Sequence, residues 1–239
     1  MEDQNKIPEV KIITLGDSRV GKSSLIMKFI DNRFTINYLS TIGFDLKHKL
    51  IKLDNGQQVK LIIYDTAGQE RFKSIAANYI KKANGILLIY DISEKITFNN
   101  LENWMEDIKE ENDEKMPIVL IGNKCDLRDE KKEEKKGEKE PEKEEKEEKD
   151  PKKVGVTIEE GQSLAKKFNL KFYETSCKTG VNVEEAFMDL TGQVLEKMGG
   201  KKIEQNAKKL EQRKPDKKKK RNVAFNKFNN MNKFNVLFR

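Results

Sequence analysis

The sequence is poor in the features that mark secreted and membrane-spanning proteins. Its 239 residues include only two cysteines, Cys125 and Cys177, which excludes a framework of several disulfides. No apolar run approaches the ~18 residues that a helix needs to span a bilayer. The chain begins Met-Glu-Asp-Gln-Asn, without the basic and then apolar pattern of a secretory signal. These absences predict a protein of the reducing cytosol.

Apolar residues are also scarce, at 36% of the chain against 37% charged residues, so part of the chain is expected to lie outside any core. Residues 129–153 are nearly all Lys and Glu, with 10 basic and 12 acidic residues, and predict a solvated insertion or, alternatively, a partner-binding arm. Residues 200–239 hold 14 basic and 3 acidic residues, so the basic excess of the chain belongs to its end. We predict a short extension at 1–8, one domain at 9–198 and a basic tail at 199–239.

The domain alternates short apolar segments with segments of helical periodicity. The predicted strands are Glu9–Leu15, Phe44–Leu53, Gln58–Asp65, Gly85–Asp91, Met116–Gly122 and Lys171–Thr175. The predicted helices are Ser24–Asp31, one that contains Phe98–Ile108, one that starts at Thr157 and one that starts at Asn182. Asn55-Gly56 predicts a hairpin turn between the second and third strands. The pattern favours an α/β fold: about six mostly parallel strands, one of them antiparallel, in a three-layer arrangement with helices on both faces.

A phosphate-binding pattern, G-x-x-x-x-G-K-[ST], follows the first strand. It covers Gly16–Ser23, which reads Gly-Asp-Ser-Arg-Val-Gly-Lys-Ser. Backbone N–H groups of such a loop point at phosphate oxygens, Lys22 can reach the terminal phosphates, and the Ser23 hydroxyl can ligate Mg²⁺. The candidate nucleotide contacts are Asp17, Ser18, Arg19, Val20, Gly21, Lys22, Ser23 and Ser24. A glycine-rich turn between a strand and a helix, without a ligand, is the alternative.

A second group of candidate residues surrounds the end of the third strand. Asp65 can hold Mg²⁺ directly or through water, although a carboxylate there can also serve only as a turn residue. Gly68 can bring its N–H to a γ-phosphate, and Gln69 is placed to orient an attacking water. Thr41, in the loop before the hairpin, could give the metal a second protein oxygen. The predicted metal ligands are thus Ser23, Thr41 and Asp65, and the predicted catalytic residue is Gln69.

A third motif, Asn123-Lys124-Cys125-Asp126, follows the fifth predicted strand and bears on the choice of base. A carboxylate at Asp126 can accept both the N1–H and the 2-amino group of guanine, whereas adenine has neither donor there. The Lys124 stem can cover the base, and Asn123 can tie this loop to the phosphate loop. The segment Ser176-Cys177-Lys178 can add a backbone N–H for guanine O6 and a second aliphatic stem.

In this order the motifs resemble those of the Ras superfamily of small GTPases, over about residues 9–198 without the charged insertion. The resemblance is strongest to the Rab family. It is carried by Ile42–Leu46, Lys60–Thr66 and Ala67–Ile75, and more loosely by Tyr79–Gly85 and Ile89–Ser93. The resemblance implies a P-loop NTPase-type fold, a guanine contact from the edge of Phe34, and a nucleotide contact from Tyr38.

The resemblance also implies a function. A Rab-like protein binds GTP or GDP with Mg²⁺, hydrolyses GTP and acts as a switch in vesicle and membrane traffic, because two loops relax when the γ-phosphate is lost. Exchange factors, GTPase-activating proteins and effectors would bind residues 34–46 and 68–79, and the protein would be a monomer. Two alternatives stay open: a GTP-binding scaffold with little hydrolysis, and a nucleic-acid binder that uses the basic tail. We expect no specific nucleic-acid partner, because no nucleic-acid motif accompanies the tail.

Three features depart from the family pattern. Arg19 stands where many relatives carry Gly or Ser, and it either faces solvent or approaches the phosphates as an in-cis arginine finger. Cys177 replaces the usual alanine, and its thiol is expected to stay free beside that of Cys125. The chain ends Asn-Val-Leu-Phe-Arg, without a prenylation signal. Residues 213–239, polybasic and then rich in Phe and Asn, form either a disordered tail or a peripheral contact with an anionic membrane. The expected location is therefore the cytoplasm or the cytosolic face of a membrane.

Overall fold

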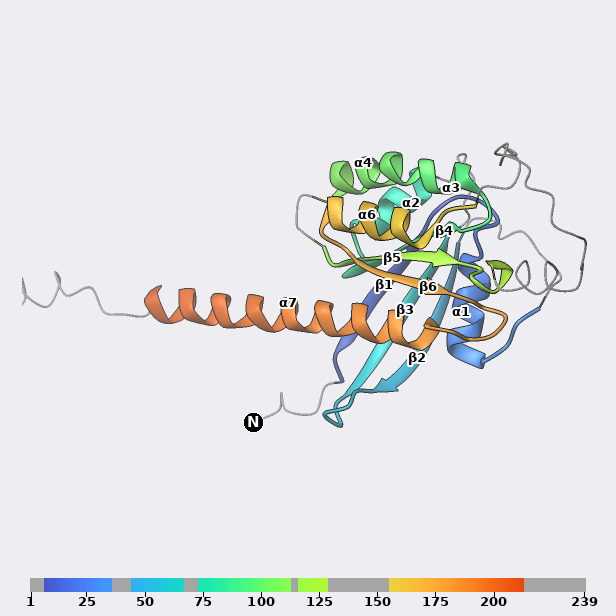
Figure 1. The fold of residues 1–239 in the computed structure, drawn as a ribbon. Coiled ribbons are helices and arrows are strands. Elements are labelled where there is room, and N and C mark those ends of the chain that lie inside the picture. The colour runs from blue at the N-terminus through green and yellow to red at the C-terminus, as the bar shows by residue number, and fades with distance from the viewer. Residues whose placement is uncertain (1–6, 36–43, 67–72, 113–115, 129–154, 213–239) are drawn as a thin grey trace, which may run out of the picture. The chain divides into compact units, whose positions relative to one another are not determined.

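The computed structural model describes residues 7–35, 44–66, 73–112, 116–128 and 155–212 (Figure 1). By its internal contacts the chain divides into two units, residues 1–195 and 196–239. The first unit contains the sheet and every candidate site residue that the structure describes.

The described residues form one six-stranded sheet, ordered β2-β3-β1-β4-β5-β6 (Figure 1). Its strands are β1 (Glu9–Leu15), β2 (Phe44–Lys52), β3 (Gln58–Thr66), β4 (Gly85–Asp91), β5 (Ile118–Asn123) and β6 (Lys171–Thr175). Only the pair β2 and β3 is antiparallel, whereas β3, β1, β4, β5 and β6 are parallel neighbours. The predicted fold class, a mostly parallel sheet of about six strands with one antiparallel strand, is confirmed; the structure places that strand, β2, at the edge.

The turn between β2 and β3 has the chemistry that its sequence predicted. Gly56 has a φ of 83°, a left-handed conformation that glycine adopts without steric cost. The Asn55 side chain accepts a hydrogen bond of 2.9 Å from the Gln57 N–H. Lys52 consequently pairs with Gln58, and this register continues to Phe44 opposite Thr66.

The described helices are α1 (Lys22–Asp31), α2 (Lys73–Ile80), α3 (Lys95–Asn99), α4 (Leu101–Glu111), α6 (Ile158–Phe168) and α7 (Val183–Gln212). The predicted capping box of α6 is present: the Glu160 N–H donates to the Thr157 hydroxyl at 3.2 Å, and the Thr157 N–H donates to the Glu160 carboxylate at 3.0 Å.

Some helix boundaries differ from the prediction. Helix α1 begins at Lys22, two residues before the predicted start at Ser24, because the phosphate loop leads directly into it. The stretch 98–108 is divided between α3 and α4 at Asn100. The Asn182 side chain donates to the Glu174 carbonyl at 2.8 Å, which anchors the entry to α7 on β6. Helix α7 continues to Gln212, beyond residue 198, where we predicted the domain to end.

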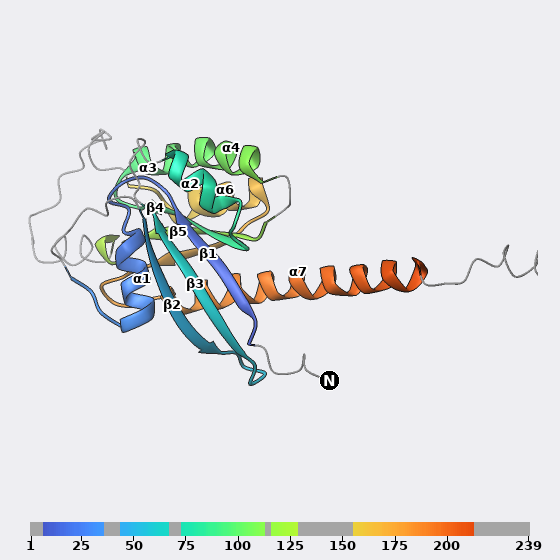
Figure 2. The same cartoon turned by 180° about the vertical axis from the view of Figure 1, so that it is seen from behind.

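Alternate side chains of the central strands face two different helical layers. Ile13, Ile86 and Leu88 join the buried cluster that contains side chains of α2, α4 and α6. On the other face, Phe29 of α1 stacks on Phe187 of α7, with ring centroids 3.9 Å apart. Figures 1 and 2 show α2, α4 and α6 together on one side of the sheet and α1 on the other. With both faces covered, the parallel strands are apolar almost throughout.

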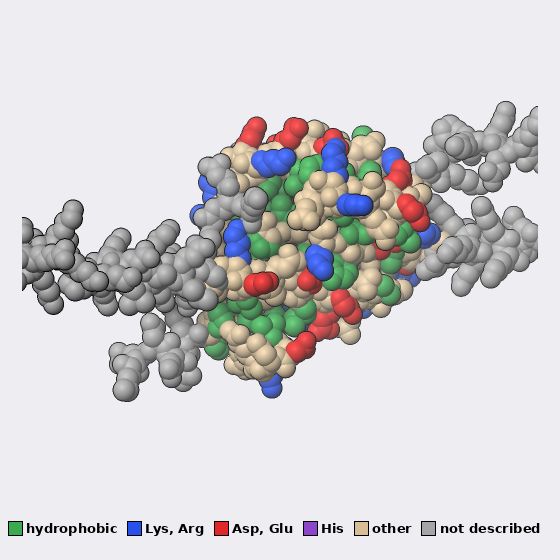
Figure 3. All heavy atoms as spheres, turned by 60° about the vertical axis from the view of Figure 1, so that its left-hand side comes forward, with side chains coloured by type: hydrophobic (Ala, Val, Ile, Leu, Met, Phe, Trp, Pro, Cys, Tyr) green, Lys and Arg blue, Asp and Glu red, His purple; other side chains and the backbone are tan. Residues whose placement is uncertain are grey.

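One face of the described part carries charges of both signs. On the face drawn in Figure 3, Lys and Arg side chains are interspersed with Asp and Glu side chains. Among the described residues, no helix combines the length and the apolar character needed to cross a membrane.

Candidate functional site

The two glycines of the phosphate loop are required by its geometry. Gly16 has a φ of 136°, and a Cβ there would lie 2.0 Å from the Ile89 carbonyl oxygen. Gly21 has a φ of 97°, and a Cβ there would lie 2.3 Å from Asn123 Nδ2. Both positions therefore exclude any larger residue, and the loop passes close to β4 and to the loop after β5.

The loop ends where helix α1 begins, in a form suited to an anion. Gly21 is the N-cap of α1, makes no side-chain capping bond, and is followed by a first turn without acidic residues. The first N–H groups of a helix lack partners within the helix and carry partial positive charge. A phosphate can therefore supply the acceptors that a capping side chain supplies elsewhere.

Lys22 is buried at this helix start, with 5% of its surface exposed. Its ammonium donates to the carbonyl oxygens of Gly16, at 2.9 Å, and Asp17, at 2.7 Å. Burial lowers the pKa of Lys22 from 10.5 to about 8, although the carboxylates of Asp65 and Asp17 oppose that shift. The ammonium is thus poorly solvated, which strengthens its attraction for phosphate oxygens.

Asp65 is the second-to-last residue of β3, lies beside Ser23 and has the environment expected of a cation ligand. It is 5% exposed, and burial raises the pKa of its carboxyl, against the lowering effects of the Ser23 hydrogen bond and the Lys22 charge. Among the described residues its Oδ1 atom is buried without a hydrogen-bond partner. A buried, unsatisfied carboxylate oxygen next to a serine hydroxyl is a donor set of the kind that Mg²⁺ accepts.

Asn123 joins three loops at the carboxyl edge of the sheet. Its Nδ2 donates to the Val20 carbonyl of the phosphate loop at 2.8 Å. Its Oδ1 accepts from the Thr175 hydroxyl at 3.1 Å and from the Cys177 thiol at 3.4 Å. These bonds fix the phosphate loop, the loop after β5 and the loop after β6 relative to one another.

The two charged residues of the same motif are held in place by different partners. The Ser176 hydroxyl donates to Asp126 Oδ1 at 2.5 Å, so this carboxylate is oriented before any base arrives. The backbone of Lys124 has a φ of 69°, in the left-handed region that residues other than glycine rarely adopt. Its ammonium pairs with Asp91 Oδ2 at 2.5 Å.

Sequence reasoning missed the role of Asp91. The residue is 3% exposed, and its Oδ1 accepts from the Ser93 N–H and hydroxyl at 2.9 and 2.7 Å. The sequence did contain a signal for this role: Asp91 is a carboxylate at the end of β4, a strand whose other residues are apolar or glycine. Asp91 therefore positions the side chain of Lys124 and is itself one step removed from the candidate base site.

The three departures that the sequence raised have different surroundings. Arg19 is exposed and has a φ of 66°, which agrees with a solvent-facing side chain. Cys177 is buried, and burial raises the pKa of its thiol from 9.0 to about 11. Among the described residues, Cys125 and Cys177 are not joined in a disulfide. The C-terminal segment 213–239 lies outside the described residues.

Four predicted site residues also lie outside the described residues: Tyr38, Thr41, Gly68 and Gln69. The predicted partner-binding segments 34–46 and 68–79 are described only in part. Within them Phe34 is 40% exposed and Phe44 is 43% exposed. Phe44 packs against Tyr79 with ring centroids 4.4 Å apart, so an apolar surface is present beside β2.

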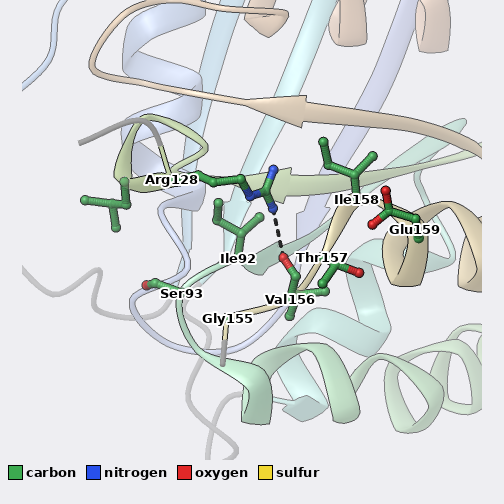
Figure 4. A pocket seen from close by; sticks show the side chains of 9 residues that line it. Ile92, Ser93, Arg128, Gly155, Val156, Thr157, Ile158 and Glu159 are labelled. Atoms are coloured by element: carbon green, nitrogen blue, oxygen red, sulfur yellow. Dashed lines mark hydrogen bonds between the residues drawn. The ribbon is translucent and has the colours of Figure 1, made fainter. Parts of the chain in front are cut away.

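A separate cavity of about 390 Å³ borders the end of the loop after β5 (Figure 4). It is lined by Ile92, Ser93, Leu127, Arg128 and residues 155–159. Arg128 pairs with Glu174 and donates to the Val156 carbonyl at 2.8 Å, as Figure 4 shows for the second bond. No phosphate-loop residue lines this cavity, so it is distinct from the candidate site.

Comparison with known proteins identifies the family. Residues 11–196 match the model of the Ras family. The chain is a member of the Ras family of small GTPases. It is 41% identical over 196 residues to the GTP-binding protein yptV2 of Volvox carteri, an alignment that covers 82% of this chain and 80% of that protein. It is 38% identical over 198 residues to Rab-13 of Rattus norvegicus, covering 83% and 86% of the two chains. The value for RABE1d of Arabidopsis thaliana is 38% over 189 residues, covering 79% and 77%.

Membership of the Ras family gives the site its chemistry. Ras-family proteins bind guanine nucleotides and hydrolyse GTP, and the relatives named above include Rab proteins. The predicted resemblance is thus confirmed, and this small GTPase is Rab-like.

Proposed function

We propose that this Rab-like GTPase is a molecular switch of vesicle and membrane traffic, and that its nucleotide site is the carboxyl edge of the sheet. The observation that supports the site most directly is the set of hydrogen bonds made by the Asn123 amide. They hold the phosphate loop together with the loops after β5 and β6, which carry the candidate base contacts. We assign phosphate contacts to residues 17–24 and Gly68. Guanosine contacts are assigned to Phe34, Asn123, Lys124, Asp126, Ser176, Cys177 and Lys178, and Tyr38 is assigned a contact with the nucleotide.

The residues present fit a magnesium ion. Ser23 and Asp65 would hold it, together with Thr41, and the unsatisfied Oδ1 of Asp65 supports this assignment. When bound, Mg²⁺ neutralises charge that develops on the β- and γ-phosphates. Lys22 supplies a second positive charge from the helix start, and Gln69 orients the attacking water.

The switch itself depends on two segments. Thr41 and Gly68 would contact the γ-phosphate and metal in the GTP state, and hydrolysis would release both segments. Exchange factors, activating proteins and effectors would then distinguish the two states at residues 34–46 and 68–79. The exposure of Phe34 and Phe44 supports an interaction surface there.

The division of the chain into domain, insertion and tail is proposed from its composition. Residues 9–198 form the domain, 129–153 are an insertion within it, and 199–239 are the basic tail. We propose that the protein acts as a monomer in the cytoplasm and contacts the cytosolic face of anionic membranes through 213–239. In sedimentation with anionic liposomes, full-length protein should bind in a salt-sensitive manner. Equal sedimentation of a chain truncated after residue 212 would remove this assignment.

One experiment tests the proposed activity. Affinities for GTP, GDP and ATP are measured with Mg²⁺, followed by single-turnover hydrolysis, for the wild type and Gln69→Leu. We expect guanine nucleotides to bind, ATP to bind far more weakly, and the variant to bind GTP but hydrolyse it much more slowly. ATP binding as tight as GTP binding would contradict the assignment of Asp126.

The scaffold alternative is left open by the identity of Arg19, which stands in the phosphate loop where many relatives carry Gly or Ser, although the presence of Gln69 argues against it. Arg19→Gly separates the possibilities. Slower hydrolysis in this variant would support an arginine finger, unchanged hydrolysis would eliminate it, and faster hydrolysis from a nearly inactive wild type would support the scaffold. Nucleic-acid binding through the tail ranks last, because charges of both signs are mixed on the face of the domain in Figure 3.

A further inference from the structure

The side chain of Asp17 is turned away from the phosphate loop that contains it. Its Oδ1 accepts a hydrogen bond of 2.8 Å from Trp104 Nε1, and its Oδ2 accepts one of 2.7 Å from Asn100 Nδ2. Both donors belong to the start of α4, more than eighty residues further along the chain. A carboxylate that engages two neutral donors through both oxygens makes strong, directional bonds.

The backbone of the same residue holds the lysine of the site. The Asp17 carbonyl accepts from the Lys22 ammonium at 2.7 Å. A rotation of residue 17 would therefore shift the resting position of that ammonium and the direction of the neighbouring loop N–H groups. The side chain resists such a rotation, because it is bonded to a helix that is itself anchored in the core.

Helix α4 is a rigid support. Trp104 is 6% exposed and belongs to the buried cluster with Leu101 and Met105. Asn100 is both the C-cap of α3 and the N-cap of α4, so the two helices fix the position of its backbone, from which its side chain extends. The hydrogen bonds to Asp17 consequently connect the phosphate loop to the main core rather than to another surface loop.

We propose that Asp17 is a positioning residue, which holds the phosphate loop in its nucleotide-binding shape through Asn100 and Trp104. It does so without touching the phosphates through its side chain. This inference rests on the guanine-nucleotide binding that the family shares, and it adds a connection between the loop and α4.

The connection predicts a kinetic effect. Asp17→Asn leaves one acceptor oxygen for two donors, and Trp104→Phe removes one donor while it keeps an aromatic ring in the core. Either change should speed GDP release by roughly threefold to tenfold, since a loop that is free to rotate loses alignment with the phosphates. In the double variant the second change should add less than about twofold, because both remove the same connection.

The chain offers a direct spectroscopic readout, because Trp104 is its single tryptophan. In a ¹H–¹⁵N spectrum of the full chain one indole N–H signal is expected. It should be protected from exchange in the GDP complex, shift when GDP is removed, and lose its protection in Asp17→Asn. A merely structural role would not make this signal respond to nucleotide.

A matched control separates positioning from loss of stability. Tyr173→Phe removes a 3.1 Å hydrogen bond to the Asp189 carboxylate, between β6 and α7, without contact to the nucleotide loops. It should lower the unfolding midpoint and leave GDP release unchanged. The proposal is overturned if Asp17→Asn releases GDP at the wild-type rate, if Tyr173→Phe speeds release equally, or if the wild-type indole signal is indifferent to GDP. The last measurement decides the matter even if a Trp104 variant fails to fold.

Discussion

The buried charge of Lys22 should make the nucleotide-free protein more stable as the pH rises from about 8 to 10.5, the folded and ordinary pKa values of this lysine. Between them the unfolded chain still holds the proton that the folded protein has released. The free energy of unfolding therefore increases with pH in this window. Each pH unit adds about 1.4 kcal/mol, so the full increase approaches about 3 kcal/mol. Below pH 8 both states are protonated, and the penalty of the buried charge is complete.

Urea unfolding of nucleotide-free wild type and Lys22→Met, at several pH values across this window, measures the effect. The difference between their unfolding free energies should move in favour of the wild type by about 2 to 3 kcal/mol as the pH rises. Burial raises the pKa of the Cys177 thiol, which gives an opposite slope, but that contribution is common to both proteins and cancels. Lys171→Met, at an exposed lysine, controls for the removal of a charge. Parallel curves for wild type and Lys22→Met would refute the reasoning.

Three further predictions concern the base-binding loops. Wild type should prefer GDP over IDP by roughly tenfold to a hundredfold, because IDP lacks the 2-amino donor; Asp126→Ala should bind both weakly and alike in competition titrations, and a retained preference would contradict the assignment. Asp91→Asn removes the charge that holds Lys124, so release of a fluorescent GDP should be roughly tenfold faster in stopped flow; a wild-type rate would show that the ion pair is dispensable. At about pH 8 an alkylating reagent should modify Cys125 before Cys177, whose burial keeps its thiol protonated; peptide mass mapping that finds Cys177 modified first would contradict this order.

Local motifs were predictable because the interactions that form them join residues close together in the sequence. The hairpin at Asn55-Gly56 follows from a turn that requires a left-handed residue, and the start of α6 follows from the mutual bonds of Thr157 and Glu160. The phosphate loop belongs to the same class, since its glycines and its lysine serve one short segment. Helix boundaries were less predictable: the division at Asn100 was not visible in a periodicity that runs through both α3 and α4.

The pairing of the supporting residues could not be predicted from the sequence. Asp91 and Lys124 are separated by more than thirty residues, as are Asp17 and Trp104, and no periodicity joins such pairs. They meet because parallel strands end at one edge of the sheet and because α4, which packs on one face of the sheet, begins beside the phosphate loop. The partner of a charged side chain is decided by this packing, not by its neighbours in the chain.

The sequence by itself determined that the protein is an α/β GTPase of the Ras family, because its motifs are each formed by a few consecutive residues. It also proposed which of those residues contact phosphate and which contact guanine. Only the tertiary structure decided what holds these residues in place: the Asn123 amide across three loops, Asp91 behind Lys124, and α4 behind Asp17. The physical reason is that a hydrogen bond is effective only when both partners are fixed to within a few tenths of an ångström. Across such sequence separations that precision comes from the packed core.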